Sequence, residues 1–414
     1  MSHIAQSFKI RNTTFKNRII KGAMSEALAN HAGQPNKLHL GLYDAWGKGG
    51  LGCAITGNVM VDFRAKNEPG VVVVETERDL EKLTAWANVG KKHDMVQLIQ
   101  LSHPGRQCPR GLNKETVAPS AVAFSPTLAT TFGTPRALEE AEILDIIQRF
   151  AESARICEKA GFEGVQLHGA HGYLISQFLS PLTNKRQDQW GGSIENRSRF
   201  LLEIYKAVRA KTSENFIVSV KLNSADFQRG GITEEEVIHV FKAIDAAGID
   251  LIEVSGGTYE APAMAGAKAD KRKASTIARE AYFLDFAEKI RKEVKCQLMV
   301  TGGFRTAQGM NAALDSGACE FIGIARPLAV ETDVSNSLIA GRDVRYAVEQ
   351  IKTGIPFVDK MAIMEILWYA AQFKAIGEGK QPNPKLSPLK VFLNYAKNNV
   401  KAVIQGRVNS RKSA

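Results

Sequence analysis

Eight short apolar segments with strand character recur along the chain, and each is followed by a stretch with helical periodicity. Strand and helix that alternate eight times predict an α/β fold, the (β/α)8 TIM barrel, in which parallel strands close into a cylinder. A doubly wound sheet is the main alternative, and it is disfavoured because no Gly-x-Gly-x-x-Gly follows the first strand. The predicted strands are 18–24, 51–61, 95–102, 164–168, 216–223, 251–255, 297–301 and 321–325.

The helices between these strands carry their own signals. Residues 137–159 have apolar side chains at the spacing of one buried helix face. Thr233 begins a Thr-Glu-Glu-Glu capping pattern, and Gly248 is placed to end the same helix. We expect the barrel to occupy residues 1–345.

The remaining residues, 346–414, are predicted to form a C-terminal helical extension with a basic tail. Its helices are expected at 358–376 and 389–405, separated by the breaker Pro-Asn-Pro. The apolar face of the second helix predicts packing, either on the barrel or on a partner subunit of a homo-oligomer.

The composition indicates which kinds of partner and which cellular compartment to expect. The net charge is +11, but seven Lys or Arg and no acid lie from Lys385 onward, and no nucleic-acid motif accompanies them, so we expect no nucleic-acid partner. The apolar runs are too short to span a bilayer, so no membrane partner is expected. The five cysteines are scattered, and the N-terminus lacks the apolar core of a signal peptide, so reduced thiols and a cytoplasmic location are expected.

A cluster of chemistry-bearing residues follows the fourth predicted strand, in the run His168-Gly-Ala-His171-Gly-Tyr173. Ligands of parallel α/β proteins gather at the carboxyl ends of the strands. Two imidazoles there can hold one oxygen atom of a ligand, and the phenol can donate a proton. A structural role and a metal pair are the alternatives. No third metal ligand lies nearby at a familiar spacing, so we predict no metal.

Strands seven and eight end in Thr301-Gly-Gly-Phe-Arg305 and Gly323-Ile-Ala-Arg-Pro327. Glycines at these ends let backbone N–H groups approach a ligand, and a phosphate site after strands seven and eight recurs in this fold. Three insertions, 104–136, 182–196 and 258–276, are expected to cover the pocket.

Six segments form a set that stands in one order along the chain: 17–25, 97–106, 168–173, 177–181, 190–197 and 301–304. Together they resemble the Old Yellow Enzyme family of FMN-dependent NAD(P)H:flavin oxidoreductases, or ene-reductases. The resemblance covers roughly residues 5–345 in the correct order and agrees with the strand count. It implies non-covalent FMN, NADH or NADPH as electron donor, and a small electron-poor alkene as substrate.

By position, the resemblance implies the residues that hold the cofactor. Those near the flavin ring are Ala23, Met24, Ser25, Gly57, Gln100, His168 and Lys221, and those at the phosphate are Gly303, Phe304, Ala325 and Arg326. Ser25 stands where better-known members have threonine or cysteine. Lys221 stands where the family usually has arginine, which keeps the positive charge but gives up the planar fork.

The resemblance also implies a mechanism. Hydride passes from NAD(P)H to flavin N5 and then to the β-carbon of the alkene, while His168 and His171 bond the activating oxygen and Tyr173 protonates the α-carbon. Dehydrogenase and nitro-reductase activities are alternatives within the family. A metal-dependent barrel hydrolase that uses the same histidines is a further alternative.

Overall fold

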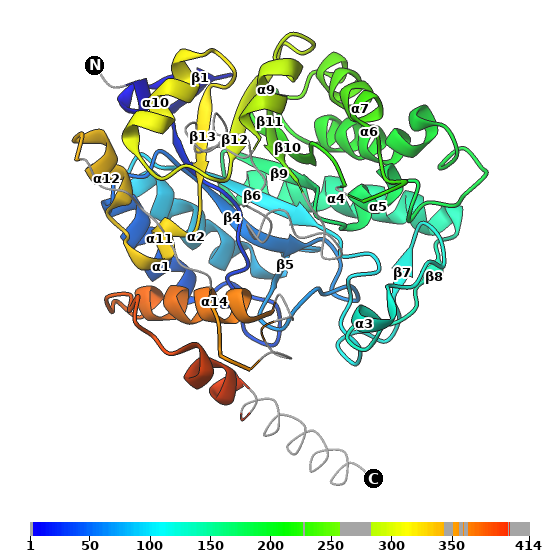
Figure 1. Ribbon diagram of the computed structural model, residues 1–414, viewed down its shortest axis with the longest axis horizontal. Coiled ribbons are helices and arrows are strands. Elements are labelled where there is room, and N and C mark those ends of the chain that lie inside the picture. Colours follow the sequence, from blue (N-terminus) through cyan, green and yellow to red (C-terminus); the bar gives the residue numbers. More distant parts are fainter. Residues whose placement is uncertain are drawn as a thin grey trace.

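Eight parallel strands close into a barrel in the computed structural model, which describes residues 3–226, 228–256, 283–342, 351–355, 359, 363–395 and 397 (Figure 1). The strands follow the order β3-β13-β12-β11-β10-β9-β6-β4, and β4 also pairs with β3, which closes the cylinder. The predicted TIM barrel is therefore confirmed. The barrel strands are β3 (Ile19–Lys21), β4 (Cys53–Met60), β6 (Val96–Ser102), β9 (Gly164–Gly169), β10 (Ile217–Asn223), β11 (Leu251–Ser255), β12 (Gln297–Thr301) and β13 (Phe321–Ile324).

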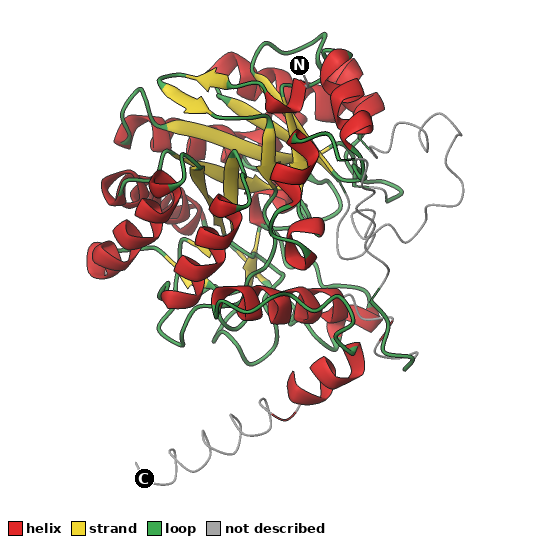
Figure 2. Cartoon of the chain, turned by 90° about the vertical axis from the view of Figure 1, so that its left-hand side faces the viewer, coloured by secondary structure: helices red, strands yellow, loops and turns green. Residues whose placement is uncertain are grey.

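Helices form the outer layer around the strands (Figure 2). Thr233 caps α7 by accepting the Glu236 N–H, and Gly248 ends it in the left-handed region, as the sequence predicts. The helices are α1 (Lys37–Lys48), α2 (Leu80–Lys92), α3 (Pro126–Ala129), α4 (Glu140–Ala160), α5 (Leu174–Leu179), α6 (Ile194–Lys211), α7 (Glu234–Ala247), α9 (Leu284–Ile290), α10 (Ala307–Asp315), α11 (Pro327–Val330), α12 (Val334–Ile339) and α14 (Ile363–Gly377).

Short strands decorate the barrel, and none was predicted. In the insertion 104–136, β7 (Val117–Ala118) pairs with β8 (Arg136–Ala137), which is why α4 begins at Glu140 and not at 137. The insertion predicted at 258–276 lies outside the described residues. The strands not yet given are β1 (Phe8–Ile10), β2 (Thr13–Phe15) and β5 (Val72–Val73).

The interior of the barrel is apolar at one end and polar at the other. The hairpin β1–β2 inserts Ile10 and Phe15 into a cluster with side chains of the barrel strands, and the rings of Phe15 and Phe321 lie 4.9 Å apart. This apolar cluster closes the amino-terminal end. Buried polar side chains such as Gln100, His168 and Lys221 lie toward the carboxyl ends of the strands, where ligands of this fold usually bind.

The C-terminal extension packs on the barrel wall. α14 lies beside α1 (Figure 1), and the rings of Phe373 and Trp46 are 5.5 Å apart. A Cβ on Gly41 of α1 would lie 2.3 Å from the Gly377 carbonyl oxygen, so the helices approach closely. Residues 388–395 are helical, and the rest of the predicted helix 389–405, apart from 397, lies outside the described residues. The predicted boundary at 345 and the basic tail beyond 405 also lie outside them.

None of the described helices is both long and apolar enough to cross a membrane. The five cysteines are buried and form no disulfide.

Candidate active site

A chain of buried polar side chains crosses the carboxyl end of the barrel. Gln100 Nε2 of β6 donates to Gln166 Oε1 of β9 at 2.8 Å, and Gln166 Nε2 donates to Glu253 Oε2 of β11 at 2.9 Å. Glu253 Oε1 in turn lies 2.9 Å from Lys221 Nζ of β10. All four side chains are buried, so Gln100 and Lys221 are held in fixed positions, as a cofactor site requires.

A second buried ion pair anchors the loop after β3. Lys21 Nζ lies 2.9 Å from Glu26 Oε1 and donates to the Ile55 carbonyl at 3.0 Å. Glu26 Oε1 also accepts from the Tyr43 hydroxyl at 2.7 Å and from the Gly57 N–H at 3.0 Å. Burial lowers the pKa of Lys21, and the carboxylate of Glu26 opposes that shift. The pair ties the Ala23–Ser25 segment to β4.

β4 is irregular where it meets this loop. Its pairing with β6 shifts between Ile55 and Asn58, which is a β-bulge. A Cβ on Gly57 would lie 2.6 Å from the Met24 carbonyl oxygen, so only glycine fits between the two segments. The structure therefore brings Gly57 and Met24 together, as their assigned roles require.

His168 and His171 converge with Tyr173 at the mouth of the barrel. The two imidazole centroids are 5.3 Å apart, and the ring of Tyr173 lies 4.5 Å from that of His168. The Ala170 N–H donates to His168 Nδ1 at 3.4 Å, so Nε2 of His168 carries the proton in the neutral ring. His171 Nε2 lies 2.9 Å from the Ser255 hydroxyl.

Both imidazoles stay neutral near pH 7. Burial holds the pKa of His168 and of His171 well below its usual value, and the positive charge of Lys221 adds to the effect. A neutral buried imidazole can donate one N–H to a ligand oxygen without bringing a competing charge into the site. Two such imidazoles can hold one oxygen atom of a ligand between them.

The phenol oxygen of Tyr173 accepts hydrogen bonds from two side-chain amides. It accepts from Asn67 Nδ2 at 3.2 Å and from Asn58 Nδ2 at 3.4 Å. Sequence reasoning missed both asparagines, because Asn58 lies on β4 and Asn67 in the loop after it, far along the chain from Tyr173. Glu253 and Gln166 were missed for the same reason.

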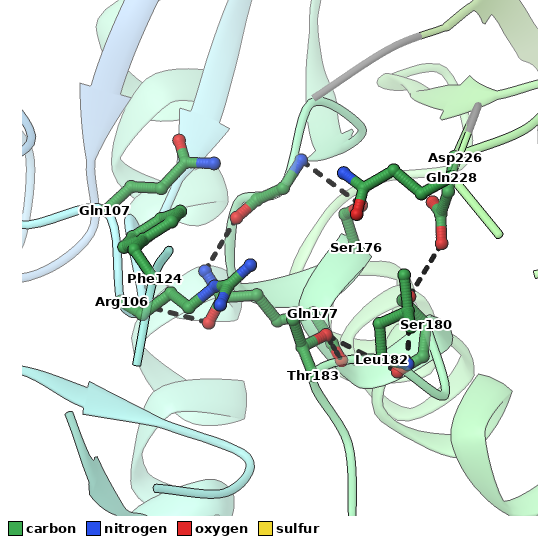
Figure 3. Close-up of a pocket in the computed structure, with 11 residues that line it drawn as sticks. Arg106, Gln107, Phe124, Ser176, Gln177, Ser180, Leu182, Thr183, Asp226 and Gln228 are labelled. Atoms are coloured by element: carbon green, nitrogen blue, oxygen red, sulfur yellow. Dashed lines mark hydrogen bonds between the residues drawn. The ribbon is translucent and has the colours of Figure 1, made fainter. Parts of the chain in front are cut away.

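Gln177 holds the loop that follows β9 and carries His171 (Figure 3). Gln177 Nε2 donates to the Gly172 carbonyl at 2.7 Å, and its Oε1 accepts the Arg106 N–H at 3.1 Å. Gln107 Nε2 donates to the His171 carbonyl at 2.7 Å. The insertion after β6 thus supports the loop after β9. Residues of both segments belong to the sequence segments that carry the family resemblance.

The glycine ends of β12 and β13 lie on adjacent strands. Gly303 has a φ of +100°, a conformation that favours glycine. A Cβ on Gly323 would lie 1.9 Å from Thr301 Oγ1, so this position also requires glycine. Phe304 is buried, and Arg326 lies directly after Ala325, at the residue before the first turn of α11. The structure therefore brings the four residues predicted at the phosphate to one edge of the barrel.

The site has a neighbour that the sequence did not predict. A cavity of about 670 Å³ lies among the loop after β4, the insertion 104–136 and α4, and its lining includes Phe63, Lys66 and His103. Burial lowers the pKa of His103 to about 4, so this ring is also neutral. Lys66 directly precedes Asn67, which places the cavity next to the phenol site.

Within the described part of the chain, no group of three or more His, Cys, Asp or Glu side chains is arranged to hold a metal ion.

The comparisons with known proteins identify the family. The model of the NADH:flavin oxidoreductase / NADH oxidase family matches residues 4–344. The chain belongs to this family, the Old Yellow Enzyme family. It is therefore a flavin oxidoreductase.

Relatives and solved structures are similar over most of the chain. The NADH-dependent flavin oxidoreductase iliE of Hypocrea jecorina (strain QM6a) is 38% identical over 351 residues, which are 80% of this chain and 87% of the relative. The complex of 2-naphthoyl-CoA reductase with 2-naphthoyl-CoA is 26% identical, covers 90% of this chain and 58% of its own, and has a TM-score of 0.78. The old yellow enzyme homologue from Zymomonas mobilis, 23% identical, shares the fold with a TM-score of 0.71 over 86% of this chain and 95% of its own.

Proposed function

We propose that this flavin oxidoreductase uses FMN and NAD(P)H to reduce an electron-poor alkene conjugated to a carbonyl or related group. The observation that carries the proposal is the convergence of two neutral imidazoles and a phenol beside the buried ammonium of Lys221.

The residues present fit FMN. The glycines at 57, 303 and 323 lie where a Cβ would clash or where φ is positive, and the Gln100 amide and Lys221 ammonium are buried and immobile. When bound, FMN would accept hydride from NAD(P)H and supply hydride to the alkene. The residues proposed to hold it are Ala23, Met24, Ser25, Gly57, Gln100, His168 and Lys221 at the ring, and Gly303, Phe304, Ala325 and Arg326 at the phosphate.

Lys221 contributes a fixed positive charge. Its ammonium lies in a buried site, where a charge acts more strongly than in water. A cation near the pyrimidine side of a flavin favours the reduced anionic form. Because Glu253 holds the ammonium at 2.9 Å, the charge is pre-organised before any ligand arrives.

His168 and His171 would orient the substrate. Hydrogen bonds from their N–H groups to the carbonyl or nitro oxygen stabilise the negative charge that develops there as hydride reaches the β-carbon. Tyr173, whose ring packs on His168, would give its proton to the α-carbon.

Two measurements test these roles. Denaturing the purified protein and chromatographing the released cofactor should yield one FMN per chain, and FAD or no flavin after reconstitution with FMN would contradict the proposal. Tyr173→Phe should leave flavin reduction by NAD(P)H nearly unchanged and slow alkene reduction by about 10²–10⁴-fold, followed by anaerobic stopped flow.

The histidines should behave differently. His168→Ala or His171→Ala should weaken binding of enone ligands, because the oxygen loses a donor. Tyr205→Phe, which removes a hydroxyl from outer helix α6, is the control for an unspecific loss of stability. Equal effects of Tyr173→Phe and Tyr205→Phe on alkene reduction would refute the assignment.

A further inference from the structure

The two asparagines at Tyr173 are placed by distinct features of the fold. The bulge in β4 ends at Asn58, and a bulge re-aims the side chains that follow it. Asn67 follows Lys66, whose N–H donates to Asn113 Oδ1 at 3.0 Å and whose carbonyl accepts from Asn113 Nδ2 at 2.7 Å. Asn113 thus clamps the backbone directly before Asn67. Neither contact with Tyr173 depends on a freely moving loop.

The chemistry of an amide NH2 group sets what these contacts can do. An amide nitrogen donates hydrogen bonds and does not accept them, so both contacts place partial positive charge at the phenol oxygen. A donor aimed at an oxygen that becomes negative bonds more strongly to the charged product than to the neutral group. The 3.2 Å contact of Asn67 lies in the normal range, and the 3.4 Å contact of Asn58 is longer and weaker.

We propose that Asn67, assisted by Asn58, is a positioning residue that makes Tyr173 a better proton donor by stabilising the phenolate that proton transfer leaves behind. The inference rests on the proposed role of Tyr173. In this step the O–H bond of Tyr173 breaks and its electron pair stays on the phenol oxygen. The proton forms a C–H bond with the electron pair at the α-carbon of the substrate, and solvent then returns a proton to the phenolate.

The charged groups near Tyr173 stay the same when Asn67 is replaced. His168 and His171 are neutral, and Lys221 keeps its charge and its partner Glu253 in every Asn67 variant, so its effect on Tyr173 is common to all of them. The carboxyl of Glu68 accepts hydrogen bonds from Asn67 and Ser25, and burial together with the nearby charge of Glu26 raises its pKa to about 7. Glu68 is therefore largely uncharged below that pH and does not oppose the phenolate there.

Two substitutions of similar shape separate the electrostatic role of Asn67 from its volume. Asn67→Leu removes the donor, and Asn67→Asp replaces it with a carboxylate that repels a phenolate. In the holoenzyme reduced beforehand, we expect the rate of alkene reduction to fall about tenfold for Asn67→Leu and further for Asn67→Asp. Asn58→Leu should have a smaller effect, and reduction of the flavin by NAD(P)H should be unchanged in all three variants.

The pH profile adds a readout that a structural role would not move. If Asn67→Leu makes Tyr173 a weaker acid, the alkaline decline of the alkene-reduction rate should shift to higher pH. The same substitutions made in the Tyr173→Phe protein should have no further effect, because the group that they act on is gone.

The outcomes distinguish the two proposals. A Tyr173→Phe protein that reduces the alkene normally contradicts the proposed function itself. A slow Tyr173→Phe protein combined with Asn67 variants of wild-type rate overturns only the role of Asn67. Asn67 variants that also slow flavin reduction, or that slow the Tyr173→Phe protein further, show a structural effect and overturn the inference as well.

Discussion

Removing Lys221 should lower both the free energy of unfolding and the reduction potential of the flavin, for two separate reasons. In Lys221→Met, the carboxylate of Glu253 keeps the hydrogen bond from Gln166 but loses its ion-pair partner at 2.9 Å. Glu253 is completely buried, and breaking a buried pair by removing one partner costs about 3–5 kcal/mol. We expect a loss of about 3 kcal/mol in the free energy of unfolding, since one hydrogen bond to Glu253 remains.

The double variant Lys221→Met/Glu253→Gln isolates the second effect. A neutral glutamine at 253 no longer needs a cation, so most of the lost stability should return. The cation near the flavin is still missing, so the reduction potential should fall on the order of 30–60 mV in both the single and the double variant, which equals roughly 1.4–2.8 kcal/mol.

Urea unfolding of the apoprotein measures the first effect, and anaerobic titration of the holoenzyme against a reference dye measures the second. Glu253→Gln alone is the matched control, because it keeps the cation. A single variant as stable as the wild type, or a double variant as unstable as the single one, would refute the reasoning from the buried pair. A wild-type potential in both would place Lys221 away from the ring.

Three further predictions follow from the described geometry. In the folded protein, neither His168 nor His171 should titrate between about pH 6 and 8, because both imidazoles are already neutral, and a titration of either ring seen by NMR inside this range would contradict this. Since these two histidines bind protons near pH 6.5 in the unfolded chain and not in the folded site, stability should fall as the pH drops below about 6.5. Because the pKa of Glu68 is raised to about 7, the folded protein loses stability as the pH rises from about 4.5 to 7. Glu68→Gln should therefore be more stable than the wild type at pH 8 but not at pH 4, by at most about 2 kcal/mol because the side chain is partly exposed. A gain in stability that does not depend on pH would contradict this. Gly57→Ala should weaken FMN binding and lower the free energy of unfolding by about 1–3 kcal/mol, because the new Cβ would lie 2.6 Å from the Met24 carbonyl oxygen. Wild-type affinity for FMN in equilibrium dialysis would argue against this close approach.

The sequence predicted the barrel well because its strands are buried on both faces. Such strands read as short apolar runs, and all eight were found, although β3 is shorter than expected, Ile19–Lys21 instead of 18–24. The hairpin β1–β2 was missed because each of its strands has only three residues, one or two of them polar. Such a strand is too short for an alternating pattern to be read.

The active-site residues divide in the same way. His168, His171 and Tyr173 could be predicted because they stand in one short run at the end of one strand. Asn58, Asn67 and Glu253 come from other segments, and they meet this cluster only once the barrel has closed. Their types are ordinary for a strand end or a loop, so no spacing in the sequence singles them out.

In the proposed reaction, hydride reaches one carbon of the alkene while Tyr173 protonates the other. Hydrogen isotopes can be traced in a single turnover with nicotinamide deuterated at C4, ordinary water and an enone in excess. We expect deuterium at the β-carbon and hydrogen from water at the α-carbon, with proton transfer to the α-carbon selectively slowed in Tyr173→Phe. Deuterium at the α-carbon, or a saturated product formed equally fast without Tyr173, would contradict it.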